Sequence, residues 1–349
     1  MIAHIIIPLI LMSTNLRTTA KGAYNRHASK HRSVIGSPSH PPAGGRYHLH
    51  IALACPWADG ALSALYLKGL ENVISHSIVH PTWAKTKPND DSDIHHGWVF
   101  RKPGDEPLSN PLGHGSFDCD DALVPDSVTN CQSIREVYEK AGDFEGPYTT
   151  PILFDKETNT IVSNESVEIL RMLNDEFNEF AEKPDANLFP KELDETLDKL
   201  NKELVYPNVN NGVYRCGFAK SQEAYNKAVS DLFSSLEELE SLLGNQRYLG
   251  GEKFTFLDLR LFHTLVRFDP VYITYFKTNQ KRLVDFPKLL GFVRDVYSIE
   301  GVKKSVNIKH IKTHYFTSHP TLNTYGIIPV YDGPDLNVPR GADKDFHQK

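Results

Sequence analysis

Ala54-Cys55-Pro56-Trp57-Ala58 is the stretch that decides the fold of this chain. Residues 47–53 before it form an alternating apolar run that is typical of a strand. Apolar residues with helical spacing come after it: Leu62, Leu65, Tyr66 and Leu70. We therefore expect a strand that leads directly into a helix, with Cys55 at the first turn of that helix.

Cys55 stands where the start of a helix favours a reactive thiolate. Unpaired backbone N–H groups and the positive end of the helix dipole stabilise an anion there, and cysteine attacks as the thiolate. Pro56 suits the position, because a proline in the first turn gives up no helical hydrogen bond. The alternative is a buried and inert cysteine, which is common among free cysteines.

Ala58 occupies the position at which a redox dithiol motif carries its second cysteine. Cys55 therefore has no resolving partner nearby in the sequence, and an external thiol must resolve any disulfide that it forms. This pattern favours exchange with glutathione over dithiol cycling.

The composition is that of an ordinary globular protein of about two domains. The chain has 349 residues and a formal net charge of −6, and no basic patch interleaved with aromatic residues indicates nucleic-acid binding. Its four cysteines are too few and too scattered for a disulfide framework or a zinc site. We therefore expect a reducing compartment and no bound metal.

The N-terminal apolar run at residues 2–12 leaves two interpretations open. It could be the core of a secretion signal, although no lysine or arginine precedes it and no clear cleavage site follows. It is too short to span a bilayer. We favour translation from Met12 and a cytoplasmic protein without membrane contact, with residues 1–46 as an N-terminal extension and surface arm.

Residues 47–176 predict an α/β domain with a long insertion. Residues 73–79 alternate and predict a second strand, parallel to the first because a right-handed β-α-β connection joins them. Residues 81–129 lack periodicity and form the insertion, in which Trp98 is an aromatic anchor.

The rest of this domain is predicted to hold a helix near residues 134–138 and short strands at 152–154 and 161–162. Thr150-Pro151 is a candidate cis peptide bond, because a tight turn there enters a strand.

Glu165 and Ser166 open the next expected helix. Ser166 is first of all a candidate N-cap. The two residues could also hold an amino acid end, with Ser166 and free N–H groups on its carboxylate and Glu165 on its ammonium group. Both roles are compatible.

Residues 190–325 predict a second, all-helical domain, and residues 326–349 a C-terminal tail. One long apolar stripe is formed by Val229, Leu232, Phe233, Leu236, Leu239 and Leu242. Thr255 and Asp258 have the spacing of a capping box at the start of a buried helix. The predicted fold class is therefore α+β, with an α/β domain followed by an all-α domain.

These features together resemble the glutathione transferases, whose N-terminal domain is thioredoxin-like. The resemblance is closest to the Xi class, the glutathionyl-hydroquinone reductases, and covers about residues 22–329. Besides the Cys55 stretch, five motifs carry it in order: Gly45-Arg46-Tyr47-His48-Leu49, Asn164-Glu165-Ser166, Asn210-Asn211-Gly212-Val213-Tyr214, Val266-Arg267-Phe268-Asp269-Pro270-Val271-Tyr272 and His310-Ile311-Lys312-Thr313-His314-Tyr315.

The resemblance implies a homodimer that uses glutathione as co-substrate and removes glutathione from S-glutathionyl-hydroquinones. Cys55 would attack the glutathione sulfur, and a second glutathione would resolve the mixed disulfide to GSSG. The implied glutathione contacts are Trp98 along the peptide, Arg135 on the glycyl carboxylate, Ile152 on the cysteinyl backbone, and Glu165 with Ser166 on the γ-glutamyl end.

Tyr206, Tyr214 and Tyr272 are candidates for binding the hydroquinone, because a tyrosine offers both an aromatic face and a hydroxyl. Each of them could instead be a core residue. His310, His314 and His319 have a spacing that could ligate a metal, but a polar helix face is the simpler interpretation.

The chain departs from the family pattern at Asp59-Gly60, where the family usually has His-Arg. The Asp59 carboxylate opposes a neighbouring thiolate, so we expect a less acidic Cys55 or a shifted substrate preference. Two other functions stay open. One is a broader omega-like deglutathionylase or dehydroascorbate reductase that uses the same cysteine, and the other is a non-catalytic ligand-binding protein with the same fold.

Overall fold

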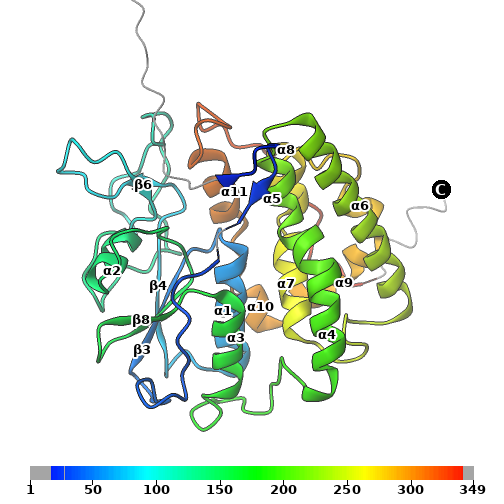
Figure 1. Cartoon of the computed structure of the whole chain (residues 1–349), viewed down its shortest axis with the longest axis horizontal. Coiled ribbons are helices and arrows are strands. Elements are labelled where there is room, and N and C mark those ends of the chain that lie inside the picture. The colour runs from blue at the N-terminus through cyan, green and yellow to red at the C-terminus, as the bar shows by residue number, and fades with distance from the viewer. Residues whose placement is uncertain (1–16, 27, 341–349) are drawn as a thin grey trace, which may run out of the picture.

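The computed structural model describes residues 17–26 and 28–340. A sheet with its own helices forms one half of the molecule, and a bundle of helices forms the other (Figure 1). The predicted α+β architecture is confirmed. The apolar run at residues 2–12 lies outside the described residues. None of the described helices is both long enough and apolar enough to cross a bilayer.

The main sheet has four strands in the order β4-β3-β7-β8. The strands of the chain are β1 Arg17–Thr18, β2 Tyr24–Asn25, β3 Tyr47–Ile51, β4 Ser75–Ile78, β5 Ala84–Lys85, β6 His96–Gly97, β7 Ile152–Asp155 and β8 Thr160–Ser163. β4 runs parallel to β3, as predicted, whereas β7 and β8 are antiparallel to their neighbours. All five residues of β3 are buried, so this strand forms the centre of the sheet.

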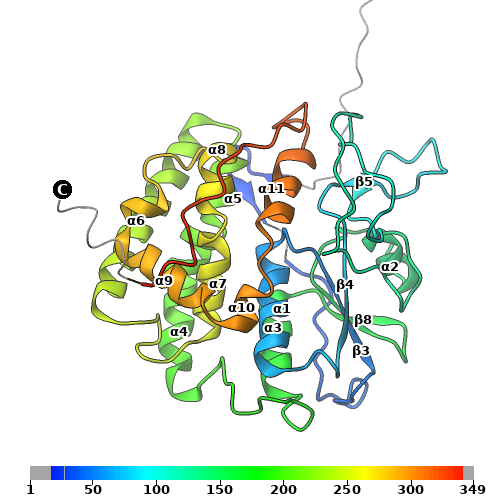
Figure 2. The same ribbon diagram turned by 180° about the vertical axis from the view of Figure 1, so that it is seen from behind.

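Helices cover both faces of the sheet and build the second half. They are α1 Pro56–Lys68, α2 Ile134–Lys140, α3 Ser166–Asp175, α4 Asp194–Leu200, α5 Gly212–Gly217, α6 Gln222–Asn245, α7 Phe256–Leu265, α8 Ile273–Tyr275, α9 Pro287–Tyr297, α10 Glu300–Lys303 and α11 Ile308–Thr317. In both views α1 and α3 lie between the sheet and the helical half, and α2 lies on the opposite face of the sheet (Figures 1 and 2).

Helix α1 starts directly after Cys55, as the sequence predicts. Cys55 is its N-cap residue, with extended backbone angles, and Pro56 occupies the first helical position. The helix ends at Gly69, whose φ of 65° is the left-handed conformation that glycine adopts at low cost. Because α1 is almost wholly buried, it is a shared element between the two halves.

Two local predictions are confirmed. The Thr150–Pro151 peptide bond is cis at the entry to β7. At the start of α7, the Asp258 carboxylate accepts hydrogen bonds from the Thr255 backbone N–H at 2.8 Å and from the Leu249 N–H at 2.7 Å. This carboxylate therefore anchors both the helix start and the turn before it.

The segment before β3 is more than the surface arm that we expected. The Ser33 N–H donates to the Val162 carbonyl at 2.9 Å, so the arm lies along the outer strand β8. Ile35 is only 2% exposed and belongs to the main hydrophobic core. A segment with few apolar residues gave no periodic signal, and its packing depends on the sheet edge that it covers.

One buried guanidinium joins the two halves. Arg267, which follows α7, donates from Nε to the Ala54 carbonyl at 3.1 Å and from Nη2 to the Leu53 carbonyl at 3.1 Å. Its Nη2 also pairs with the carboxylate of Asp59 on α1. Both side chains are fully buried. This contact therefore holds the turn that carries Cys55 against the helical half.

Replacing Arg267 with methionine should lower the free energy of unfolding by about 3–5 kcal/mol, because it leaves the Asp59 carboxylate buried without its partner. Chemical denaturation measures this loss. Replacing Asp59 with leucine in the same chain should restore part of the stability, since no unpaired charge then remains.

Arg215 provides the matched control for this experiment. It pairs with Asp231 at 2.7 Å on a partly exposed surface. Its replacement with methionine should cost about 1 kcal/mol or less. Equal losses at Arg215 and Arg267 would contradict the role given to the buried pair.

Candidate active site

Cys55 lines a cavity between the two halves of the molecule, where β3 meets α1. Its sulfur lies 3.6 Å from the carbonyl oxygen of Thr150, the residue that precedes the cis proline. The backbone N–H groups of Trp57 and Ala58 point toward the sulfur and lower the pKa of the thiol. The turn therefore supplies the anion-stabilising donors that the sequence predicts.

Burial nevertheless acts more strongly than these donors and raises the pKa of the Cys55 thiol above its usual value. The Arg267 charge lowers this pKa, and the Asp59 charge raises it. In the unliganded chain, burial therefore opposes the thiolate that the start of the helix stabilises. The less acidic cysteine that we expected from Asp59 has the correct direction, but burial is the larger cause.

The cavity above Cys55 has a volume of about 480 Å³ and is lined by both halves of the molecule. This volume lies in the usual range for sites that bind small molecules. The sheet half contributes four of the five glutathione contacts implied by the resemblance, namely Trp98, Arg135, Glu165 and Ser166. The fifth, Ile152, is not in the lining.

Ile152 is fully buried in the core and pairs with His50 in the sheet. Thr150 lies at the cavity wall instead, and its hydroxyl is buried without a partner among the described residues. The residue before the cis proline therefore lines the cavity, and the residue after it does not. The sequence signal for this place was the proline itself.

The other predicted glutathione residues have the following contacts. The Arg135 guanidinium pairs with Asp93 at 2.6 Å and with Glu139 at 2.8 Å, so its charge is already balanced within the chain. The Glu165 carboxylate accepts from the Ser29 hydroxyl at 2.9 Å. Ser166 is the first residue of α3 rather than its N-cap, which is Glu165.

The tyrosines come from the helical half and form a hydroxyl chain. The hydroxyls of Tyr214 and Tyr315 lie 2.7 Å apart, and those of Tyr272 and Tyr315 lie 3.2 Å apart. Tyr206, Tyr214 and Tyr315 line the cavity, whereas Tyr272 is fully buried behind them. Tyr272 therefore supports the wall, and Tyr315, which is itself buried, takes the place in the cavity lining that we expected for Tyr272.

Burial keeps these phenols neutral. The pKa values of Tyr214 and Tyr315 are raised well above the usual value, mainly because both side chains are desolvated. Neutral phenols can donate hydrogen bonds to the oxygens of a bound ligand.

Two π-helical segments shape this wall, Asn201–Asn210 and Phe268–Tyr272. The first carries Tyr206, and the second ends at Tyr272. Short 3-10 segments occur at Lys191–Leu193 and Leu283–Asp285. The wide turns of π-helices are frequent at functional sites, and helical spacing in the sequence does not reveal them.

The aromatic wall above the sheet half contains the histidines of α11 and the turn after it. The Trp98 and His314 rings stack with their centroids 4.3 Å apart, and His314 Nδ1 contacts the Pro81 carbonyl at 2.9 Å. His310 contacts Asp120 at 2.9 Å instead. Because His310 and His314 are both buried, the expected polar helix face is wrong.

The N-terminal arm also reaches the site, which the sequence gave no reason to expect. Arg26 lines the cavity, and its guanidinium lies 4.9 Å from the Trp57 ring centroid and 4.8 Å from that of Tyr214. Its Nε donates to the Asn211 side chain at 3.1 Å. No local pattern marks such a residue, because only the folded arm brings it to Cys55.

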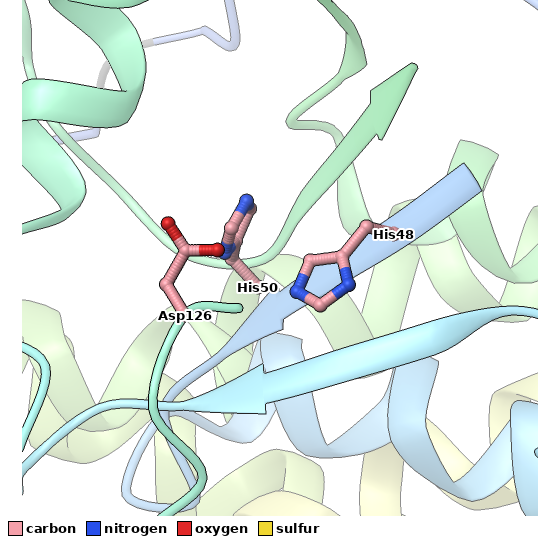
Figure 3. Close-up of side chains that lie close together, drawn as sticks. All are labelled: His48, His50 and Asp126. Carbon is pink, nitrogen blue, oxygen red and sulfur yellow. The ribbon is translucent and has the colours of Figure 1, made fainter. Parts of the chain in front are cut away.

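A separate buried cluster, His48, His50 and Asp126, has the donor types of a metal site (Figure 3). The imidazole Nδ1 atoms contact serine hydroxyls of β4, each at 2.7 Å. Burial lowers the pKa of His48 to about 2 and that of His50 to about 4, so both rings are neutral.

The carboxylate of Asp126 in this cluster is engaged by its own turn. Its oxygens accept from the backbone N–H groups of Val128, Thr129 and Cys131 and from the Thr129 hydroxyl. To bind a metal ion, the carboxylate would have to give up one of these bonds. The cluster is therefore explained as the anchor of a turn.

Two family models match the chain. The model of the glutathione S-transferase N-terminal domain matches residues 54–176, and that of the C-terminal domain matches residues 222–295. The chain is 41% identical to the glutathionyl-hydroquinone reductase YqjG of Escherichia coli, over 93% of this chain and 94% of the relative. It is 39% identical to the glutathionyl-hydroquinone reductase PcpF of Sphingobium chlorophenolicum, over 91% and 92%.

Solved structures agree with these matches. The glutathione S-transferase Xi of Phanerochaete chrysosporium has a TM-score of 0.80 and 39% identity, over 93% of this chain and 96% of that one. The glutathione-bound structure of YqjG from Escherichia coli has a TM-score of 0.76 and 40% identity, over 93% and 94%.

Replacing Asp59 with asparagine should lower the pKa of the Cys55 thiol, because it removes a charge that raises this pKa and leaves the Arg267 charge that lowers it. The rate of thiol alkylation against pH measures the effect, with Cys55→Ser as the blank. The rate should rise at lower pH in the variant than in the unchanged chain. Asp198→Asn, at an exposed position of α4, is the control. Superimposable profiles for all three chains would contradict the prediction.

Proposed function

Since the chain belongs to the Xi class of the glutathione transferase family, we propose that it is a glutathionyl-hydroquinone reductase. Its substrate is an S-glutathionyl-hydroquinone and its co-substrate is glutathione. One observation carries the proposal. Cys55 lies between a wall with the expected glutathione contacts and a wall of tyrosines, and the other three cysteines of the chain do not line the cavity.

The reaction proceeds in two thiol exchanges. The Cys55 thiolate attacks the sulfur of the bound conjugate, and a disulfide forms between Cys55 and glutathione. The electron pair of the broken carbon–sulfur bond stays with the ring carbon, which takes up a proton, and the hydroquinone leaves. A glutathione thiolate then attacks the glutathione sulfur of the mixed disulfide, which releases GSSG and the Cys55 thiolate.

The wall contributed by the sheet half binds glutathione. Glu165 and Ser166 hold the γ-glutamyl end, Trp98 lies along the peptide, and Arg135 faces the glycyl carboxylate. Thr150 supplies the main-chain contact beside the cis proline. The N–H groups of Trp57 and Ala58 stabilise the Cys55 thiolate whenever it forms.

The tyrosine wall receives the hydroquinone. Its ring lies against Tyr206 and Tyr214. Because the bond between the Tyr214 and Tyr315 hydroxyls uses the proton of one of them, the other hydroxyl of this pair donates to an oxygen of the ring. The Tyr315 hydroxyl also lies within hydrogen-bond distance of the Tyr272 hydroxyl. Tyr315 therefore connects Tyr214 with Tyr272, and the three phenols hold one another in place.

We also propose that the protein is a cytoplasmic homodimer. Membership of the family supports the dimer, and four free thiols suit a reducing compartment. Light scattering of the purified chain measures the oligomeric state, and a fluorescent reporter fused to residues 1–30 shows the compartment.

Purified protein with excess glutathione should release hydroquinone from an S-glutathionyl-hydroquinone, and the Cys55→Ser variant should release none. Chromatography of the products measures both hydroquinone and GSSG, which should appear in equal amounts. Cys119→Ser is the matched control, because Cys119 is buried away from the cavity, and it should keep the activity. Release by the Cys55→Ser variant, or no release by the unchanged protein while glutathione binds, would overturn the proposal.

A further inference from the structure

Two arginines of the cavity lie on the same tryptophan. The Arg26 guanidinium lies 4.9 Å from the Trp57 ring centroid, and the Arg260 guanidinium lies 5.4 Å from it. Arg26 comes from the N-terminal arm and Arg260 from α7, so elements far apart in the sequence bring the two cations together. Both residues line the cavity above Cys55.

Neither of these guanidiniums forms an ion pair with a carboxylate in the part of the chain that the structure describes. Arg26 Nε donates to the amide oxygen of Asn211 at 3.1 Å, and Arg260 Nη1 donates weakly to that of Asn201 at 3.4 Å. The Nε of Arg260 is buried without a partner among the described residues. Arg135, the third arginine of the cavity, differs because two carboxylates balance its charge.

Burial opposes both charges. It lowers the pKa of Arg260 to about 10, where the Arg26 charge acts in the same direction and Tyr206 and Glu165 act against it. The pKa of Arg26 is raised overall, because Tyr24 and Tyr214 act against its burial. The faces of Trp57, Tyr206 and Tyr214 relieve part of the cost of burial through cation–π contacts. An anionic group bound beside them would relieve more, because a charge-assisted hydrogen bond in a desolvated site is among the stronger polar contacts.

These cations lie on the wall that receives the hydroquinone. Arg260 lies 5.2 Å from the Tyr206 ring centroid, and Arg26 lies 4.8 Å from that of Tyr214. The predicted contacts of the glycyl carboxylate and the peptide, Arg135 and Trp98, come from the sheet half. The positive charges of Arg26 and Arg260 are therefore available to a substituent on the hydroquinone ring.

We propose that Arg26 and Arg260 form a subsite for an anionic substituent on the hydroquinone ring, so that the preferred substrates are glutathionyl conjugates of hydroquinones that carry a carboxylate. The inference rests on the function proposed above and names its substrate class. A neutral quinol brings no carboxylate within hydrogen-bond distance of either guanidinium, whereas a ring carboxylate can accept from their N–H groups.

The test compares two conjugates that differ only in the ring, S-glutathionyl-hydroquinone and S-glutathionyl-carboxyhydroquinone. The unchanged protein should have a kcat/KM at least about tenfold higher for the carboxylated conjugate, as expected for one charge-assisted hydrogen bond. Arg260→Gln should remove most of this preference, and Arg260→Lys should retain part of it. Arg282→Gln, at an exposed position outside the cavity, should leave the preference unchanged.

Binding is measured separately, in the Cys55→Ser background, by the change in tryptophan fluorescence. The carboxylated conjugate should bind more tightly than the neutral one, and Arg26→Gln and Arg260→Gln should each reduce that difference. Equal affinities for the two conjugates would overturn the subsite. An equal loss for both conjugates in the arginine variants would also overturn it, because the arginines would then serve the carboxylates of glutathione.

The two proposals can fail independently. Turnover of the neutral conjugate without preference for the carboxylated one would contradict the subsite and leave the reductase function standing. Tighter binding of the carboxylated conjugate without release of any hydroquinone would support the subsite and contradict the reductase function.

Discussion

The site depends on one buried ion pair, between Arg267 of the helical half and Asp59 of α1. The same guanidinium binds the carbonyls of Leu53 and Ala54, which immediately precede the nucleophile. Removing either charge leaves the other buried and unpaired, so the two halves are bound to one another at the point where chemistry takes place. Cys55 is therefore positioned by both halves, although it belongs to only one of them.

The pair also explains how the chain accommodates Asp59-Gly60 in the place of the family's usual His-Arg. The Asp59 side chain is fully buried and pairs with Arg267, and the two charges act on the Cys55 pKa in opposite directions. A Cβ at Gly60 would lie 3.5 Å from Leu170 and 3.9 Å from His263, at ordinary contact distance. The charge that this departure introduces is thus paired within the core, and burial remains the main influence on the pKa of the Cys55 thiol.

The cavity is assembled from segments that the chain keeps far apart. The sheet half supplies the cysteine and the wall with Trp98 and Glu165, and the helical half supplies the tyrosines. The N-terminal arm closes the space with Arg26, and its Ser29 fixes the Glu165 carboxylate. The long insertion between β4 and α2 is held in place by α11, where His314 stacks on Trp98. Each wall is thus supported by an element from elsewhere in the sequence.

The sequence by itself determined the elements and the kind of chemistry. Alternating and helical spacing on either side of Cys55, the Thr150-Pro151 turn and the Thr255–Asp258 capping box all act over a few residues, so local patterns predict them. The cysteine without a second thiol indicated exchange with glutathione for the same reason. Only the tertiary structure decided that Thr150 rather than Ile152 lines the cavity, that Tyr315 lines it and Tyr272 does not, and that Arg26 and Arg260 meet on Trp57. These are outcomes of packing between distant segments. The pKa of the Cys55 thiol depends on the same packing, because the whole fold determines how far the sulfur is removed from water.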